Sequence, residues 1–371
     1  MKLLIIGAGP TGLAAALFCA ARGHEVRIVD QRVERSSHSK AFGVNPRTLE
    51  LLEETGATER FLANGRRMSA VNLWVGERHV VRNDLTPVAH RYNFMLVQSQ
   101  ADSERILEEQ LASRGVLVER GVSLHTVEVE RDRVVATLGG RRQERAEAEI
   151  LLGADGSGSS VRESLGIAFE GKGSAEPWRL YDVELEVETL ANDEAHMVML
   201  REGALFLVRI GGKVWRVLGN VPDLLERLPA GVRAGVVHWS SDFGIANKAA
   251  ASFSDKDRVF LAGDAAHIHS GLGARGMNLG IEDAFVFADR LTAGQRSRYG
   301  EERRRVVLPL MRRIDRLTGV MRGQSFLARA ARWVVPAVGP ALIPLALPTL
   351  RRFVLGLDHP VERLAAKPGL A

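Results

Sequence analysis

The first 30 residues contain an apolar segment, a glycine-rich turn, a helical segment and a second apolar segment that ends on an acid, in that order. Residues 2–6 form the short apolar run that is typical of a buried parallel strand. Residues 11–22 have helical spacing and strong helix formers, and Gly23 ends this helix. The segment "EVRIVD" predicts a second strand that ends at Asp30. Together these segments predict the first β–α–β unit of a parallel sheet.

The glycines of the turn follow the pattern G-x-G-x-x-G, and each has a physical role. Gly7 permits a tight turn, Gly9 lets the backbone approach a pyrophosphate, and Gly12 lets helix and strand pack closely. The helix N-terminus offers free N–H groups to the phosphates. Asp30 is placed to accept hydrogen bonds from a ribose 2′-hydroxyl. The pattern predicts a Rossmann-like domain that binds a dinucleotide, and it does not distinguish NAD from FAD. The alternative, a glycine-rich turn that binds no ligand, is less favoured.

Two later segments repeat this layout of a strand followed by a glycine-rich bend. In residues 148–166, "AEILLGADGSGSSVRESLG", we expect Asp155 and Arg162 to face a nucleotide, and a plain strand-to-helix connection is the alternative. Residues 263–284, "GDAAHIHSGLGARGMNLGIEDA", follow a predicted buried strand. Their glycines offer backbone N–H groups at a helix start, which bind an anion or a polarised carbonyl.

These three segments, in this order and at these separations, resemble the class A flavoprotein monooxygenases, the FAD-dependent aromatic hydroxylases of the p-hydroxybenzoate hydroxylase type. The segments "SKAFGVNPRTLELLEETG" and "LVQSQADSERILEEQL" are also similar to parts of that family. The resemblance covers roughly residues 1–295 at the level of motifs. It implies that the loop over residues 263–284 holds the isoalloxazine ring of FAD.

The resemblance also implies roles for single residues. The glycines of the first turn and Asp30 would hold the ADP half of FAD, and Asp264 would bind the ribityl chain. Asp155 would touch the region shared by FAD and a visiting nicotinamide nucleotide, and backbone groups of residues 276–278 would meet the flavin ring. The implied cofactor-binding residues are Gly7, Gly9, Pro10, Thr11, Gly12, Asp30, Gln31, Lys40, Gln98, Asp155, Gly156, Arg162, Gly263, Asp264, Gly276, Met277 and Asn278.

The implied activity is that of an FAD-dependent, NAD(P)H-using monooxygenase of secondary metabolism. NADH or NADPH binds transiently and reduces FAD, oxygen adds to the flavin C4a carbon, and the hydroperoxide passes one oxygen atom to an aromatic or polyketide-like small molecule. Because the cofactor carries this chemistry, the sequence requires no catalytic acid or base. Arg47 and His269 are the candidates near the site.

The predicted flavin loop departs from the family's pattern. Gly271 stands where a proline is usual and Ala274 where a second glycine is usual, so Ala274 would be strained at a positive φ. Lys40 stands where the family usually has arginine near the FAD phosphates, and Gln98 matches a glutamine near the flavin. Two alternatives stay open: an FAD-dependent reductase or saturase of a lipid or isoprenoid, and a catalytically reduced flavin-binding partner in a biosynthetic pathway.

The predicted fold is α/β, with a Rossmann-like FAD-binding domain, an inserted and mostly antiparallel substrate sheet, and C-terminal helices. Alternating segments such as "RLYDVELEVE" predict the inserted strands, with one hairpin turning at Gly211–Gly212. The predicted division is 1–67, 98–165 and 255–295 for the FAD-binding domain, 68–97 and 166–254 for the substrate domain, and 296–371 for the C-terminal helical segment.

Composition narrows the partners. The net charge is +5, but arginine and acidic residues are interleaved, which predicts a solvated surface rather than a nucleic-acid interface. The single cysteine, Cys19, excludes disulfides within the chain and indicates a cytoplasmic protein. His267 and His269 have no third ligand nearby in the sequence, so no metal site is predicted.

Residues 333–348, "WVVPAVGPALIPLALP", are apolar but contain four prolines. Each proline would delete a helical hydrogen bond, so a regular transmembrane helix is not predicted. We expect this segment to fold over the core as a cap. The alternative is a patch that lies on a membrane surface or forms a dimer, and the flanking arginines would suit that alternative.

Overall fold

The structure is a computed structural model that describes residues 1–35, 41–140, 142–322, 343 and 345–365. Its first layer is a six-stranded sheet in the order β18-β19-β12-β1-β2-β8. All neighbours in it run parallel except β18 and β19. The strands are β1 (Lys2–Ile6), β2 (Glu25–Asp30), β8 (Val118–Arg120), β12 (Ile150–Gly153), β18 (Ser254–Asp255) and β19 (Val259–Leu261).

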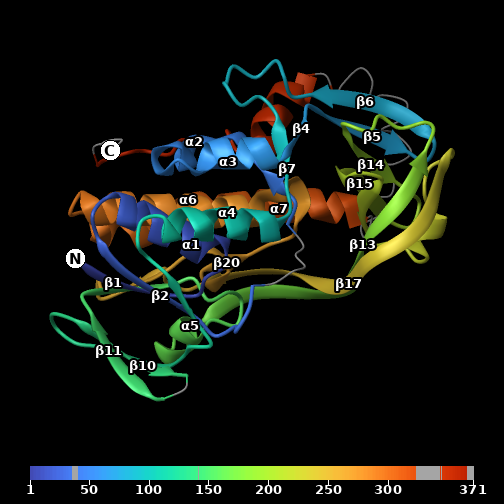
Figure 1. The fold of residues 1–371 in the computed structure, drawn as a ribbon. Coiled ribbons are helices and arrows are strands. Elements are labelled where there is room, and N and C mark those ends of the chain that lie inside the picture. Colours follow the sequence, from blue (N-terminus) through green and yellow to red (C-terminus); the bar gives the residue numbers. More distant parts are fainter. Residues whose placement is uncertain (36–40, 141, 323–342, 344, 366–371) are drawn as a thin grey trace.

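Helices cover one face of this sheet, and a small sheet with a short helix covers the other (Figure 1). The ring of Phe18 in the first helix packs edge to face on the ring of Phe285 in the sixth helix, with the ring centroids 5.5 Å apart. The helices on one face are α1 (Pro10–Ala21), α4 (Gln100–Ala112) and α6 (Arg275–Thr292), with α2 (Pro46–Leu52) and α3 (Ala57–Asn64) beyond them. The opposite face carries β9 (Ser123–Val129), β10 (Val134–Gly139), β11 (Glu144–Ala148) and α5 (Ser160–Ser164).

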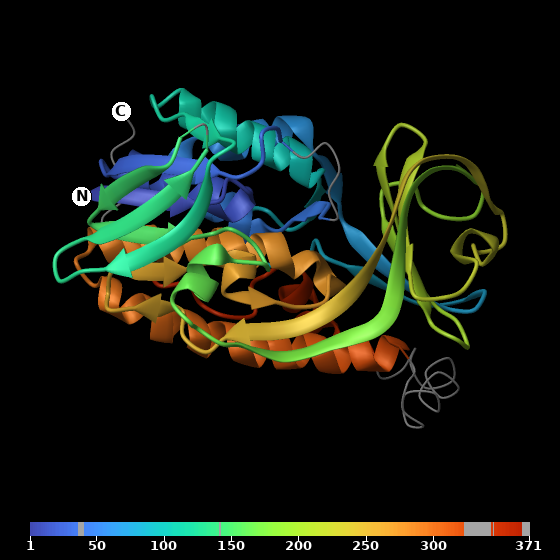
Figure 2. The same cartoon turned by 90° about the horizontal axis from the view of Figure 1, so that it is seen from below.

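A second, eight-stranded sheet has the order β20-β17-β13-β16-β15-β14-β5-β6 and is antiparallel except between β14 and β5. Two long strands, β13 and β17, run from the first layer into it (Figure 2). Its members are β5 (Ala70–Val75), β6 (Arg78–Asp84), β13 (Phe169–Val187), β14 (Ala195–Met199), β15 (Ala204–Gly211), β16 (Val214–Gly219), β17 (Val232–Ala250) and β20 (His267–Ile268).

This arrangement confirms the predicted fold class, an α/β protein with an inserted, mostly antiparallel sheet. The predicted hairpin is also present, because β15 and β16 pair antiparallel and Gly212 turns with φ +51°. A small sheet of β3 (Gly43–Val44), β7 (Met95–Val97) and β4 (Arg66–Met68) joins residues from both predicted domains. The predicted domain boundaries stay a prediction.

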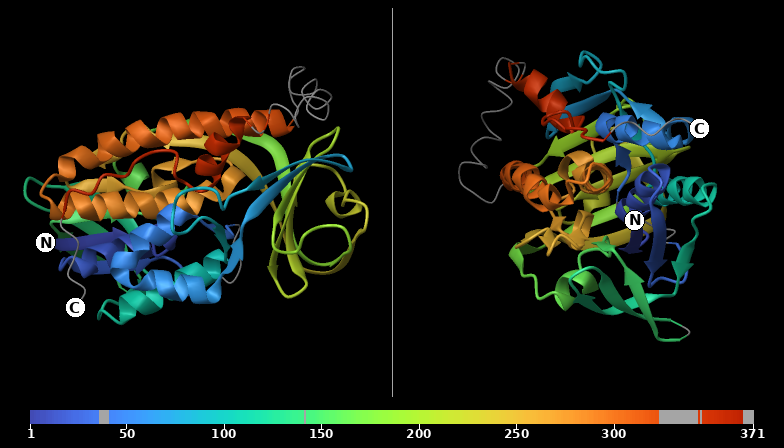
Figure 3. Two further views of the ribbon diagram at one scale, coloured as in Figure 1. Left: turned by 90° about the horizontal axis from the view of Figure 1, so that it is seen from above. Right: turned by 90° about the vertical axis from the view of Figure 1, so that its left-hand side faces the viewer.

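The last described part of the chain returns over the helices. Helix α7 (Tyr299–Arg322) lies beside α6, and residues 345–365 then run along both helices (Figure 3). Most of the predicted proline-rich segment, residues 333–348, lies outside the described residues. Among the residues that the structure describes, no helix has the length and apolar character needed to span a bilayer.

Candidate functional site

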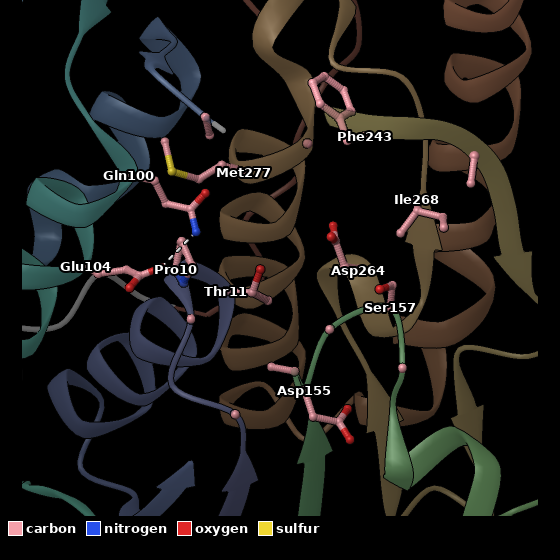
Figure 4. Close-up of a pocket in the computed structure, with 18 of the residues that line it drawn as sticks. Pro10, Thr11, Gln100, Glu104, Asp155, Ser157, Phe243, Asp264, Ile268 and Met277 are labelled. Carbon is pink, nitrogen blue, oxygen red and sulfur yellow. Dashed lines mark hydrogen bonds between the residues drawn. The ribbon is translucent and has the colours of Figure 1, made fainter. Parts of the chain in front are cut away.

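A cavity of about 810 Å³ lies where the loops after β1, β12 and β19 meet. Parallel strands bring these loops together, because their carboxyl ends share one edge of the sheet. Phe243 and Met277 lie at one end of the cavity and Asp155 at the other, with Asp264 between them (Figure 4). The predicted site residues that line the cavity are Gly7, Gly9, Pro10, Thr11, Asp30, Gln31, Asp155, Gly156, Asp264, His269, Gly276 and Met277.

The three glycines of the first loop differ in how closely other parts of the protein approach them. A Cβ on Gly7, whose φ is +102°, would lie 2.4 Å from the Ala154 carbonyl oxygen. A Cβ on Gly12 would lie 1.9 Å from the Gly7 oxygen. A Cβ on Gly9 would meet no protein atom within 4 Å, and Gly9 lines the cavity. The fold therefore requires Gly7 and Gly12, whereas Gly9 leaves open the space where a phosphate group would approach.

Asp30 ends β2 at the edge of the cavity and is buried. Its carboxylate accepts hydrogen bonds from the backbone N–H groups of Ala8 (2.7 Å) and Arg32 (2.8 Å). Burial alone would raise the pKa of Asp30, but the hydrogen bonds from Arg32 and Ala8 lower it. The carboxylate is therefore ionised at neutral pH and can accept further hydrogen bonds from a sugar hydroxyl.

In the second loop, Asp155 and Arg162 lie in different surroundings. Asp155 lines the cavity, its Oδ2 accepts from the backbone of Val161 (3.1 Å), and burial raises its pKa. Arg162 is not among the residues that line the cavity, and the expectation that it faces the nucleotide stays a prediction. Its guanidinium donates to the carbonyl oxygens of Ala265 (3.0 Å) and Ser157 (2.9 Å). Arg162 thus braces the second loop against the third.

The third loop packs directly on the first. Gly263 has φ +58°, and a Cβ there would lie 2.4 Å from the Thr11 hydroxyl oxygen. A Cβ on Gly280 would lie 2.2 Å from the same oxygen. Asp264 points into the cavity (Figure 4), and the protein around it raises its pKa through desolvation. The contact through Thr11 fixes the third loop, with Asp264, against the start of α1.

Asn278 is buried behind the cavity, and its side chain holds the start of α6 in place. Its Oδ1 accepts from the Asn45 backbone (2.9 Å) and the Thr48 hydroxyl (2.7 Å). Its Nδ2 donates to the carbonyl oxygens of Gly43 (2.8 Å) and Ala274 (2.6 Å). Gly276 and Met277 therefore reach the cavity from a backbone that Asn278 fixes.

Asp283 connects the same loop to α7 through buried hydrogen bonds. Its Oδ2 accepts from the Gly263 backbone (2.9 Å) and from His267 Nε2 (2.6 Å). Its Oδ1 accepts from Arg303 Nε (2.6 Å), and Arg303 Nη1 also donates to Glu282 (2.7 Å). Burial would raise the pKa of both carboxyls, but for Asp283 the charges of His267 and Arg303, and for Glu282 those of Arg303 and His359, lower it to about 2. Both carboxylates are therefore ionised.

Ala274 has φ +53°, in the left-handed region where a side chain is strained. We expect Ala274→Gly to raise the free energy of unfolding of the cofactor-free protein by about 1 kcal/mol, because glycine adopts this conformation without strain. Thermal or urea unfolding measures the change. Ala246→Gly, on β17 at the cavity wall, is the control and should lower stability, because glycine weakens a strand interior. Equal losses in both variants would contradict the strain at Ala274.

The remaining predicted residues lie in different places. Gln98 is buried outside the cavity wall, where its Nε2 donates to the Ser103 hydroxyl (2.9 Å). Gln100, which the sequence analysis missed, lines the cavity from the first turn of α4. Ser99 caps the N-terminus of α4, since its side chain accepts a hydrogen bond from the Asp102 backbone. A serine at this position was the sequence signal that a helix starts here and that Gln100 faces a different direction from Gln98. Lys40 lies outside the described residues.

Of the two candidate catalytic residues, only His269 lines the cavity. Its Nδ1 donates to the Ser270 carbonyl oxygen (2.8 Å), and burial lowers its pKa to about 4, so the ring is neutral. Arg47 instead pairs with Glu50 (3.2 Å) and donates to the His359 carbonyl oxygen (3.0 Å). Among the described residues, no group of histidine, cysteine and acidic side chains could hold a metal ion.

A family profile described as an FAD binding domain matches residues 1–207 and 229–313. The chain is 34% identical to 6-methylpretetramide 4-monooxygenase of Streptomyces rimosus, over 81% of this chain and 57% of that protein. It is 33% identical to rifampicin monooxygenase of Streptomyces venezuelae, over 78% of this chain and 64% of that protein. The chain thus spans about three fifths of the length of these relatives.

A solved structure shows the same fold. The p-nitrophenol 4-monooxygenase PnpA from Pseudomonas putida superposes with a TM-score of 0.84 and covers 96% of this chain and 98% of that one. At 21% sequence identity this similarity bears on the fold alone.

Proposed function

The chain belongs to the FAD-binding domain family, and we propose that it is an FAD-dependent monooxygenase that uses NADH or NADPH to hydroxylate an aromatic or polyketide-like small molecule. The observation that carries this proposal is the cavity where three glycine-containing loops meet. Three of its glycines leave open space where a cofactor would lie: a Cβ on Gly9, Gly156 or Gly276 would meet no other part of the protein within 4 Å. The relatives named above, both monooxygenases, support the same reaction class.

The open glycines and the carboxylates that line the cavity suit FAD, and we propose one orientation for it. We propose that Gly9 and the N-terminus of α1 lie at its pyrophosphate, that Asp30 accepts from the adenosine ribose, and that Asp264 accepts from the ribityl chain. Gly276 and Met277 would then lie at the isoalloxazine ring. Bound FAD supplies the redox chemistry through which electrons from NAD(P)H activate molecular oxygen.

The chain's own part is to hold the substrate and exclude water. Leu180 of β13, Leu218 of β16 and Phe243 of β17 line the cavity from three neighbouring strands of the second sheet. Such a wall holds an apolar ring and keeps water from the reacting atoms. Neutral His269 lines the cavity, and its ring nitrogen Nε2 is buried and has no hydrogen-bond partner among the described residues. We also propose a cytoplasmic location, which buried Cys19 supports.

The reaction is tested on the purified full chain loaded with FAD, with 2-naphthol as the probe. We expect 2-naphthol to stimulate NADPH or NADH oxidation with oxygen uptake, and the product to contain one atom from labelled oxygen gas. Leu218→Arg should abolish the stimulation, whereas Leu117→Arg, at a residue that is 72% exposed, should not. Turnover of an isoprenoid without oxygen would support a reductase instead, and flavin that no nicotinamide reduces would support a non-catalytic partner.

A further inference from the structure

A buried arginine stands at the first position of α6, directly after the loop that meets the cavity. Arg275 is 1% exposed, and its chain neighbours Ala274 and Gly276 both line the cavity. Its guanidinium is directed elsewhere, toward the last part of the chain. Nη1 donates to the carbonyl oxygen of Phe353 (2.6 Å) and to the carboxylate of Asp358 (3.0 Å). The guanidinium also lies 5.5 Å from the centre of the Phe353 ring.

Residues 353–365, here called the C-terminal strap, contact α6 at both ends of that helix. At the cavity end, Asp358 accepts from Arg275, and His359 Nε2 bonds to the carboxylate of Glu282 (2.8 Å). Arg313 of α7 also reaches Asp358 (3.4 Å).

At the far end of α6, Asp289 accepts from the backbone of Leu364 (2.8 Å) and Ala365 (3.0 Å). Arg290 there donates to the Glu362 carbonyl oxygen (3.1 Å). The strap is therefore held by one buried arginine next to the cavity and by another far from it.

The charges at the cavity end are matched. Burial would raise the pKa of Asp358, but His359 and Arg275 lower it to about 2. Burial would lower the pKa of His359, but Asp358 and Glu282 raise it. A buried charge that loses its partner is costly, so this cluster holds its geometry firmly.

The loop before Arg275 contains two glycines in a 3-10 turn, which a backbone hydrogen bond from Ala274 to Gly271 closes (3.0 Å). Gly271 and Gly273 precede Arg275, and Gly273 has φ +76°. A Cβ on Gly271 would meet no protein atom within 4 Å. Glycine loses more conformational entropy on ordering than any other residue, so the hydrogen bonds of Arg275 add to those of Asn278 in keeping this loop in one conformation.

We propose that Arg275 is a positioning residue, which uses the C-terminal strap to hold residues 271–277 where they meet the isoalloxazine ring. This inference rests on the proposed function, because it assigns the ring of FAD to this loop. The strap would thereby be part of the flavin site although it does not line the cavity. Loosening this anchor leaves the contacts of the ADP half unchanged and affects the ring end alone.

The test compares two arginines of α6 that bond to the same strap. In the full chain, Arg275→Gln should weaken FAD binding about tenfold, change the fluorescence and visible circular dichroism of the bound flavin, and release more hydrogen peroxide per NADPH oxidised. Arg290→Gln, at the far end of α6, should lower the melting temperature by a similar amount and leave these flavin signals unchanged. Arg275→Lys should recover part of the wild-type signals, because it keeps the charge but not the fork of donors.

The outcomes separate this inference from the proposed function. Wild-type protein that binds no FAD overturns the proposed function. FAD-binding wild type with indistinguishable flavin signals in Arg275→Gln and Arg290→Gln overturns the positioning role alone. If Arg275→Gln does not fold, Asp358→Asn decides in its place: changed flavin signals support the anchor, and unchanged signals overturn it.

Discussion

Gly9→Val should abolish FAD binding while the cofactor-free protein stays folded. The Cβ of residue 9 points into open space in the cavity, and the backbone there is extended, with φ −77° and ψ −177°, which valine adopts readily. The added side chain would occupy the space of the pyrophosphate. We expect the dissociation constant of FAD to rise at least ~100-fold, which is about 2.7 kcal/mol. Quenching of flavin fluorescence measures the binding, and thermal unfolding without FAD measures the fold.

Gly12→Ala is the matched contrast in the same turn. Its Cβ would lie 1.9 Å from the Gly7 carbonyl oxygen, so this variant should lose stability even without FAD. A Gly9→Val protein that binds FAD like the wild type would contradict the placement of the pyrophosphate. A Gly9→Val protein that unfolds like Gly12→Ala would contradict the reading of the open space.

Arg303→Met should lower the free energy of unfolding at neutral pH by about 3–5 kcal/mol, because two buried carboxylates lose the arginine that they share and keep only His267 and His359 as partners. Arg303 is 2% exposed and pairs with Glu282 (2.7 Å) and Asp283 (2.6 Å). The control is Arg305→Met on the same helix, whose 73% exposed side chain pairs with Glu301. That exposed pair should contribute less than about 0.5 kcal/mol. Urea unfolding of both variants gives the two values.

The pH dependence gives a second readout for Arg303→Met. In the wild type, the pKa values of Glu282 and Asp283 are lowered to about 2, so their contribution is present above the unfolded-state pKa and is lost as pH falls toward 2. Without Arg303 the two pKa values should rise, and protonation then relieves the repulsion. The deficit relative to wild type should therefore be largest at pH 7 and shrink toward pH 4. A deficit that does not change with pH would contradict the role of charge.

The strand–turn–helix segments predicted the fold because each is local in the sequence. The period of apolar residues defines β1 and α1, and the glycine pattern defines the turn between them. Parallel strands then bring distant loops to one edge, so Gly9, Asp155 and Asp264 could be grouped before any coordinates were known. The hairpin between β15 and β16 followed from the same kind of local signal.

Long side chains were the part that the sequence could not place. Arg162 and Arg47 reach backbone carbonyl groups that lie far away in the chain, Ala265 and His359, so their direction depends on packing and not on local pattern. Gln98 and Gln100 differ by two positions, and the change from strand to helix between them decides which one faces the cavity. The sequence showed that Ala274 would be strained at a positive φ, but it could not predict that φ is positive there.

The contacts of the C-terminal strap were also beyond sequence reasoning. Arg275 and Asp358 are separated by 83 positions, and nothing in either segment indicates the other. Buried ion pairs of this kind follow from how helices pack, because each charge must find a partner once the fold excludes water. By contrast, composition alone was enough to exclude disulfides within the chain, because there is a single cysteine.

The central claim is that the three loops together hold FAD along one cavity, with its ADP half near Gly9 and Asp30 and its ring near Met277. Titration of the cofactor-free full chain with FAD and, separately, with FMN tests it most directly. We expect saturable binding of one FAD per chain and much weaker binding of FMN, which lacks the adenosine half. A chain that takes up no FAD, or that binds FMN as tightly as FAD, would contradict it.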